Sequence, residues 1–195
     1  MRLLPAPLRL TIVALAVQGC VAGATGTGAD PFGGGTNADG SARGSGTDVP
    51  AGYGTLRQDD ITLEIESGDL LLKVTPMAEA VIRLTAPDTY ERLRSLARSH
   101  RAMARERTGM EEPELFLVSV FSNAPNVPFE PEDLAVLSHG RRYRPVAIQP
   151  VTPGWGAQRL EQRQTRIAVY VFEAGIDLET DLQVEHRMAR DNGWS

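Results

Sequence analysis

The chain contains one cysteine, Cys20, and its chemistry is the clearest in the sequence. A cysteine thiolate is a soft nucleophile, so it can be alkylated to a thioether. Cys20 follows a largely apolar run at residues 10–17, and the leader before this run carries Arg2 and Arg9. A positive leader, a short apolar run and a small residue before the cut describe a secretory signal peptide. Because the run is far shorter than the ~20 residues that span a bilayer, we expect residues 1–19 to be a signal peptide rather than a transmembrane helix.

The sequence Val17-Gln18-Gly19-Cys20 resembles the lipobox of bacterial lipoproteins, although Gln18 stands where that family usually has a small residue. The resemblance implies cleavage before Cys20, a diacylglyceryl group on its sulfur, and acylation of the new N-terminus. Each buried CH₂ of an acyl chain contributes about 0.8 kcal/mol, so two or three chains give a stable anchor. Val21 follows the cysteine, whereas Asp there marks inner-membrane lipoproteins of enteric bacteria, so the resemblance favours the outer membrane, facing the periplasm. The alternative is an ordinary secreted protein with a free thiol.

The three histidines do not predict a metal site. His100, His139 and His186 are far apart in the sequence, and none forms an H-x-x-x-H pair. Ser138 precedes His139, but a serine nucleophile needs a glycine-flanked turn between a strand and a helix, which this segment lacks. We therefore expect neither a metal nor another cofactor, and no catalytic residue.

Carboxylates at alternating positions offer a second kind of chemistry. They are Asp177, Glu179 and Asp181, and Glu130 with Glu132. Such acids could contribute oxygen ligands to Ca²⁺, but the EF-hand spacing with its glycine is missing. The simpler interpretation is that these charges keep a strand edge solvated and unpaired.

Arginine, tyrosine and tryptophan are enriched in protein-binding hot spots, and two segments present them. One is the basic turn around Arg141, Arg142, Tyr143 and Arg144, and the other is a Gly/Pro-framed loop that carries Trp155. We predict that these five residues bind a partner, which requires Trp155 and the basic turn to be exposed together. In the alternative interpretation, Trp155 packs against the edge of the fold.

The charge balance excludes some partners. The whole chain has a net charge of −5. Residues 1–19 contain two arginines and no acid, so the mature chain would carry −7. An acidic protein lacks the basic footprint of a nucleic-acid-binding domain. A single cysteine also allows no internal disulfide, so the fold must depend on its core.

Composition divides the mature chain in two. Residues 20–52 are rich in Gly, Ala, Thr, Ser and Asp, and such a segment cannot bury enough surface to offset its ordering entropy. We interpret it as a lipid-anchored flexible linker that reaches about 30 Å as a random coil. Residues 53–195 have the composition of one globular domain.

Periodicity predicts the elements of this domain. Strands are expected at 61–66, 70–74 and 80–85, followed by an amphipathic helix at about 89–107 with Asp88 as its N-cap. The exposed face of the helix carries Arg92, Arg94, Arg98, Arg101 and Arg105. We interpret this face as a solvated surface, with an anionic lipid or partner as the alternative. Further strands are expected at 115–122, 133–137, 142–149, 166–173 and 181–186, with a frayed tail at 187–195.

Many short strands joined by Gly/Pro turns predict a mostly β fold, a β-sandwich with one helix packed against it. The strand LFLVSVFS at 115–122, the segment PEDLAVLSHGRRYRP at 131–145 and the later AVYVFE at 168–173 resemble immunoglobulin-like domains of bacterial surface lipoproteins. That resemblance implies an immunoglobulin-like sandwich but no chemistry. The Cys…Trp…Cys signature of true immunoglobulin domains is absent.

The sequence therefore predicts a membrane-anchored envelope lipoprotein that acts as a non-enzymatic binding or scaffolding module, with an envelope protein as its partner. Two alternatives remain open. One is a periplasmic carrier or chaperone that holds a lipid or apolar ligand in a cavity under the helix. The other is a hydrolase with an unrecognised site.

Overall fold

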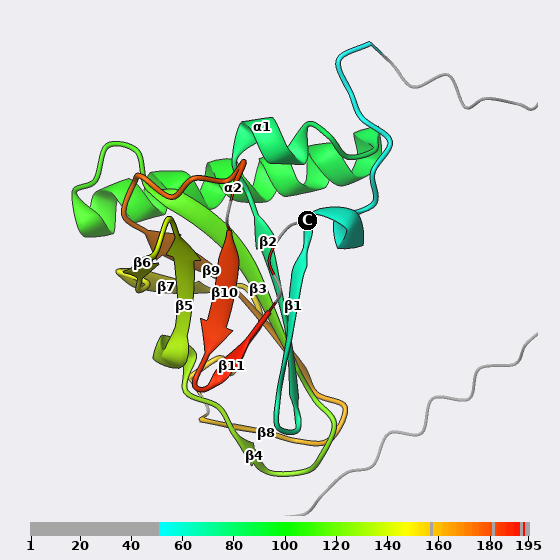
Figure 1. The fold of residues 1–195 in the computed structure, drawn as a ribbon, viewed down its shortest axis with the longest axis vertical. Helices are drawn as coiled ribbons and strands as arrows, with labels where there is room; N and C mark the ends of the chain where they lie inside the picture. Colours follow the sequence, from blue (N-terminus) through cyan, green and yellow to red (C-terminus); the bar gives the residue numbers. More distant parts are fainter. Residues whose placement is uncertain (1–50, 157, 181, 192, 194–195) are drawn as a thin grey trace, which may run out of the picture. The chain divides into compact units, whose positions relative to one another are not determined.

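The computed structural model describes residues 51–156, 158–180, 182–191 and 193, and this part of the chain is mostly β, with one long helix (Figure 1). The class predicted from the sequence is confirmed. Two antiparallel sheets face each other across a shared core, and the helix covers the other face of the larger sheet. The predicted signal peptide, Cys20 and residues 21–50 of the linker lie outside the described residues.

The described residues form fifteen helices and strands, and 3₁₀-helices are written as η. In chain order they are η1 (Gln58–Ile61), β1 (Leu63–Ser67), β2 (Leu70–Pro76), α1 (Glu79–Ile82), α2 (Pro87–Thr108), β3 (Glu114–Ser122), β4 (Val127–Pro128), η2 (Pro131–Asp133), β5 (Leu134–Ser138), β6 (Arg141–Tyr143), β7 (Ala147–Pro150), β8 (Arg159–Leu160), β9 (Thr165–Phe172), β10 (Gln183–His186) and β11 (Ala189–Arg190).

The larger sheet has the order β1-β2-β3-β9-β7, which makes β3 its central strand. Successive side chains of a strand point to opposite faces. Phe116, Val118 and Val120 therefore enter the core between the sheets, whereas Leu115 and Leu117 enter the core under α2. The strand predicted at 115–122 is confirmed, and it is central and buried on both faces.

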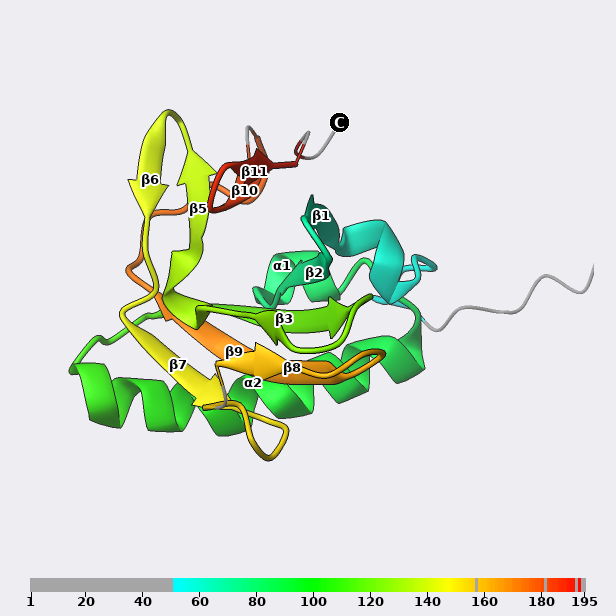
Figure 2. The same ribbon diagram turned by 90° about the horizontal axis from the view of Figure 1, so that it is seen from below.

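The smaller sheet has the order β11-β10-β5-β6 and lies against the inner face of the larger one, as Figure 2 shows. Its Leu134, Val136 and Val184 share one core cluster with Leu72 and Tyr170 of the larger sheet. Apolar side chains buried between the two sheets hold the sandwich together, at roughly 25 cal/mol per Å² of apolar surface removed from water.

Helix α2 has the predicted extent to within two residues at each end. One stripe of it is buried against the larger sheet, formed by Tyr90, Leu93, Ala97, His100 and Ala104. The predicted Asp88 cap is wrong, because the helix begins at Pro87, with Ala86 before it and no side-chain cap. Proline suits a first turn because its missing N–H would have no helical partner there. Gly109 ends the helix at φ 69°, a left-handed conformation that glycine adopts without steric cost.

The predicted third strand at 80–85 is wrong, because this segment contains the short helix α1. Val81 and Ile82 are adjacent in sequence and both buried under α2, which a strand with alternating faces would not allow. Their packing against α2 overrides the strand preference of β-branched residues. Leu84, two residues further on, is 52% exposed.

The single strand predicted at 142–149 is also wrong. It is split into β6, in the smaller sheet, and β7, in the larger sheet. Pro145 lies between them, and proline has no N–H to donate to a ladder. Arg144 therefore lies in the corner where the chain crosses from one sheet to the other.

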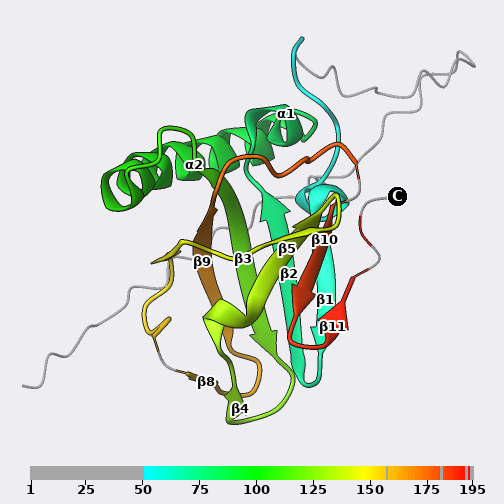
Figure 3. The same cartoon turned by 60° about the vertical axis from the view of Figure 1, so that its left-hand side comes forward.

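The segment after β10 forms a strand that was not predicted. The expected frayed tail at 187–195 contains β11, which pairs with β10, and the Val184 amide donates to the Asp191 carboxylate (2.8 Å). The segment before β9, where no strand was predicted, contains β8, which pairs with β4. Figure 3 shows β4 and β8 at the end of the sandwich that is opposite the helices.

Candidate functional site

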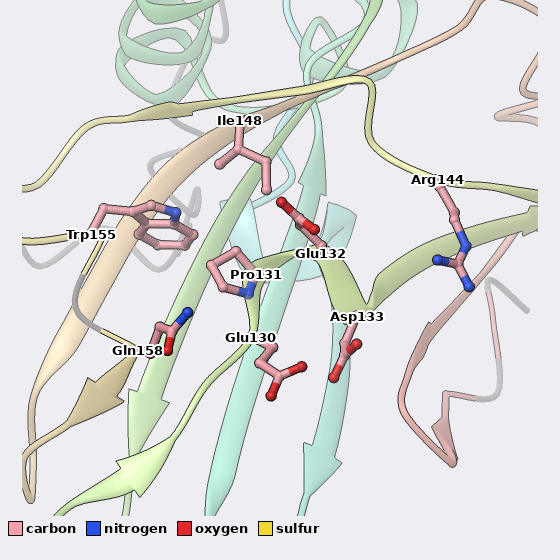
Figure 4. A pocket seen from close by; sticks show the side chains of 8 residues that line it. All are labelled: Glu130, Pro131, Glu132, Asp133, Arg144, Ile148, Trp155 and Gln158. Atoms are coloured by element: carbon pink, nitrogen blue, oxygen red, sulfur yellow. The ribbon is translucent and has the colours of Figure 1, made fainter.

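A pocket of about 440 Å³ opens between η2 and the loop that leads to β8 (Figure 4). Its walls come from three parts of the sandwich: η2 and its preceding residue, the corner and strand β7, and the loop before β8. The lining side chains are Glu130, Pro131, Glu132, Asp133, Arg144, Ile148, Trp155 and Gln158.

The loop that carries Trp155 is fixed by β9. The amides of Val151 and Thr152 both donate to the Ile167 carbonyl, at 2.9 and 3.0 Å. Gly154 has φ 73°, a left-handed conformation that glycine adopts without steric cost, and the Arg166 guanidinium lies against it. These contacts fix the backbone from which the side chain of the next residue, Trp155, points into the fold.

Trp155 closes the inner end of the pocket. It is 6% exposed and makes edge-to-face contacts with Phe129 and Tyr170, at centroid distances of 5.6 and 6.0 Å. The indole Nε1 is buried and has no hydrogen-bond partner. In Figure 4 this nitrogen lies on the edge of the ring that faces the other lining side chains. An unpaired buried donor costs about 1–3 kcal/mol, and this N–H has almost no surface open to the pocket.

The acidic wall is held in place by the larger sheet. The Tyr170 hydroxyl donates to the Pro131 carbonyl (2.9 Å), which ties η2 to β9. Burial raises the pKa of Tyr170, and the nearby Glu132 charge raises it further, so this hydroxyl stays protonated and remains a donor. The Asp133 amide donates to the Glu130 carbonyl (3.1 Å), and this turn places three carboxylate residues in the pocket lining.

Charges of both signs in the pocket lack a partner. Asp133 forms an ion pair with Arg187 (3.1 Å). Among the described side chains, Glu130, Glu132 and Arg144 form neither an ion pair nor a side-chain hydrogen bond, and all three are exposed. Figure 4 shows Arg144 on the opposite side of the pocket from Trp155, with the carboxylates between them. The pocket therefore presents a cationic end and two free carboxylates above a buried N–H.

The structure brings together two of the five predicted partner-binding residues, Trp155 and Arg144. The condition set for them, exposure of Trp155, is not met, because its ring is buried. Arg141 stacks on the Tyr143 ring (4.6 Å), and Arg142 forms an ion pair with Glu185 (3.0 Å).

The other members of the basic turn do not converge on the pocket. Tyr143 is buried and donates to the Gly175 carbonyl (2.8 Å), and Arg141 also reaches Glu173 (3.4 Å). The sequence prediction placed Glu130 and Glu132 at a solvated strand edge, and it did not identify Gln158. The proline between the two glutamates was the available signal, because it favours a turn, and this turn places both residues in the pocket lining.

The histidines do not converge either. His139 Nε2 donates to the Asp177 carboxylate (2.7 Å), and the Asp177 amide donates to the Ser138 hydroxyl (3.0 Å). Ser138 is buried, and its hydroxyl bonds the Asp177 backbone rather than the His139 ring, so these residues do not form a serine relay. His100 contacts Gln149 between α2 and β7, and His186 contacts Ser67 between the sheets. Among the described residues, no group of three His, Cys, Asp or Glu side chains could hold a metal ion.

The space under α2, where the carrier alternative requires an apolar cavity, is filled. Leu93, Ala97 and Ala104 pack there against Leu117 and Val169. An apolar groove of about 450 Å³ lies instead beside η1 and α1, lined by Leu56, Asp60, Ile61, Ala80, Val81, Leu84, Leu178 and Glu179. Within the described part of the chain, no helix is both long enough and apolar enough to cross a membrane.

Comparison of the chain with protein-family models, curated proteins and solved structures gave no match. The geometry of the pocket and the sequence signals are therefore the basis for a functional proposal.

Proposed function

We propose that this protein is a non-enzymatic binding module of the cell envelope, attached to the outer membrane by lipid on Cys20. Residues 20–52 serve as the linker, and the pocket around Trp155 is the binding site. The observation that carries the proposal is one cavity that is lined by Arg144 and Glu132, neither of which has a partner among the described side chains, and that is closed at its inner end by the Trp155 ring. Arg144 and Glu132 are exposed and hydrated in the free protein, and the charged groups of a bound ligand can replace that water.

The pocket resembles a binding site more than a catalytic site. Its volume lies within the usual range of ligand sites, about 300–1,000 Å³. No serine, cysteine, histidine or lysine lines it, so the nucleophiles that its lining could offer are carboxylates.

Site-specific photocrosslinking in intact cells tests this role. A photoreactive phenylalanine analogue replaces Gln158, at the pocket mouth, in the full lipidated chain. The matched control carries the same analogue at Glu106, an exposed position on α2. We expect an adduct from the Gln158 position that the control does not give, and mass spectrometry then identifies it. Identical adduct patterns from both positions, or none from either, would contradict a binding role for the pocket.

A second candidate function is carriage of a lipid or another apolar ligand. The groove beside η1 and α1 favours it, because most of its lining is apolar and Leu84 is half exposed. Binding of a fluorescent fatty acid should weaken in Leu84→Glu and stay unchanged in Met188→Glu, since Met188 is fully exposed and outside the groove. Equal losses in both variants, or none in Leu84→Glu, would exclude the groove as a carrier site.

A further inference from the structure

We infer that His186 makes the β10–β11 hairpin a pH-sensitive switch, in which protonation of the buried ring releases the hairpin from β1 and from η2, a wall of the pocket around Trp155. The hairpin comprises residues 183–190, with Arg187 and Met188 as its turn. The switch belongs to the fold of the domain, so it requires neither the lipid on Cys20 nor a ligand in the pocket.

His186 joins the two sheets at a place where the backbone does not. β10 and β11 lie beside β1 (Figure 3), but among the described residues no strand pairing joins them to it. His186 is fully buried at this junction, and its Nδ1 shares a hydrogen bond with the Ser67 hydroxyl of β1 (2.9 Å). Its ring also stacks on Phe129, with 6.0 Å between the centroids. The ring therefore holds the hairpin against β1 and against the segment before η2.

The neutral ring suits this position, and the protonated ring does not. A neutral imidazole has one donor and one acceptor nitrogen, whereas an imidazolium has two donors. Ser67 can pair with Nδ1 in either state, but Nε2 is buried and has no hydrogen-bond partner among the described residues. Protonation would leave a charged and unpaired N–H in the core, so the charged ring is more stable in water than in the closed hairpin.

The charges that act on the ring do not compensate for a proton. They are Asp133 of η2 and Arg187 of the turn, and these two form an ion pair with each other (3.1 Å). Burial lowers the pKa of His186, Arg187 lowers it further, and Asp133 opposes them. The closed hairpin therefore favours the neutral ring.

The other strands around the ring bring no charge to it. Glu66 of β1 and Glu185 of β10 lie on the outer faces of their strands, because successive side chains alternate. The residues paired with His186 are Leu134 of β5 and Ala189 of β11.

The hairpin is also weakly held. β11 is an edge strand of two residues. Arg187 has φ 56°, a left-handed conformation that is unfavourable for a residue with a Cβ, and Met188 beside it is fully exposed. A short edge element of this kind opens more readily than a core strand. Opening moves His186 into water and separates Arg187 from Asp133.

Opening reaches the pocket through two residues. The Asp133 carboxylate lines the pocket and pairs with Arg187 of the turn. Phe129 stacks on His186 and makes an edge-to-face contact with Trp155 (5.6 Å). Opening therefore frees one carboxylate of the pocket wall and uncovers one face of Phe129. Because coupling between two sites is reciprocal, a ligand that prefers the closed arrangement opposes opening.

Hydrogen exchange followed by mass spectrometry tests the switch in the full lipidated chain in detergent. Rates are measured at about pH 7.5 and about pH 5, on either side of the usual histidine pKa, and corrected for the intrinsic pH dependence of amide exchange. We expect residues 183–191 to exchange faster than β3 and β9 at both pH values, as a locally opening segment does. Their corrected rate should rise up to roughly thirtyfold at the lower pH, because an exposed histidine with a pKa of about 6.5 takes up a proton that the buried ring excludes.

His186→Phe keeps a ring that can stack on Phe129 and removes the titration, so its corrected rates for residues 183–191 should be equal at the two pH values. The matched controls are His100→Gln and His139→Asn, which remove the other two imidazoles and should keep the wild-type response. Proton NMR of the ring needs no variant at His186, because its signal is the histidine signal that remains in both controls. The titration midpoint of that signal should lie below about 6.5.

Two further variants test the contacts of the closed hairpin. Ser67→Ala should raise the exchange rate of residues 183–191 roughly two- to tenfold at both pH values, because one hydrogen bond to the ring is lost. Asp133→Asn should raise it roughly two- to fivefold, because the lost ion pair with Arg187 is partly exposed.

Four results would overturn the switch. Exchange of residues 183–191 at the rate of β3 and β9 would mean that only the whole domain opens. Equal corrected rates in the wild type at the two pH values, or a ring midpoint at or above about 6.5, would mean that the closed hairpin accepts the proton. A rise at low pH that persists in His186→Phe would assign the response to another group. An unchanged rate in Asp133→Asn would overturn the link to the pocket.

Discussion

Replacement of Trp155 separates the two energies that this side chain contributes to the fold. The ring fills space against Phe129 and Tyr170, whereas its N–H is buried without a partner. Trp155→Ala removes both the ring and the donor. Trp155→Phe removes the donor and keeps most of the ring, so the pair of variants distinguishes packing from hydrogen bonding.

The expected magnitudes follow from the contacts. Truncation of a buried tryptophan to alanine costs about 3–5 kcal/mol of unfolding free energy, so we expect Trp155→Ala to lose about 3 kcal/mol once the orphan donor is also gone. Phenylalanine loses roughly two CH₂ equivalents of buried surface, about 1.6 kcal/mol, but it also removes an unpaired donor that costs about 1–3 kcal/mol. The two effects offset each other, and we expect Trp155→Phe to lie within about 1 kcal/mol of the wild type.

Urea unfolding of the full chain in detergent, followed by far-UV circular dichroism, measures both changes. The midpoints should shift at an unchanged m value, because a similar surface is exposed on unfolding. A loss in Trp155→Phe that equals the loss in Trp155→Ala would refute the reasoning, since it would mean that the indole N–H is paired in the native state.

Three further outcomes follow from the charges and the lipid. Hydrogen bonds from the Glu179 amide and from His139 hold the pKa of Asp177 well below its usual range. The charged Asp177 side chain therefore stabilises the fold above its unfolded pKa of about 3.9, and this stabilisation is lost as the pH falls below that value. In thermal melts over this acidic range, Asp177→Asn should lose less stability than the wild type. Burial lowers the pKa of His186, so the folded state favours its neutral form. Thermal melts of the wild type should therefore lose stability as the pH falls below about 6.5, and melts of His186→Phe should lack this loss. For Cys20→Ala, intact-mass analysis should show no acyl mass, and the protein should leave the membrane fraction; a wild-type protein without acyl mass would contradict the lipobox interpretation.

The elements that the sequence predicted well are those in which one local pattern agrees with the tertiary packing. The run at 115–122 is apolar at nearly every position, and only a strand buried on both faces accounts for it. The stripe of α2 repeats at three- and four-residue spacing, so its buried face could be identified before its neighbours were known.

The errors occurred where the packing of distant segments decides the outcome. Val81 and Ile82 have a strand preference, but α2 covers them together and a helical turn is required. Pro145 divides the segment at 142–149 between two sheets, and the spacing of its apolar residues does not reveal that division. The pocket was hidden for the same reason, because Arg144, Glu132 and Trp155 belong to three segments that only the sandwich brings together.

The central position of β3 also has a consequence for the order in which the chain assembles. Its first neighbour, β2, is already synthesised when β3 appears, but its second neighbour, β9, follows only after residues 123–164. Until then, one side of a long apolar strand has free N–H and C=O groups, which is the arrangement that promotes association between chains. Pairing between strands that lie far apart in the sequence also slows folding. The interval between the synthesis of β3 and of β9 is therefore when the nascent chain most needs to be kept from other chains.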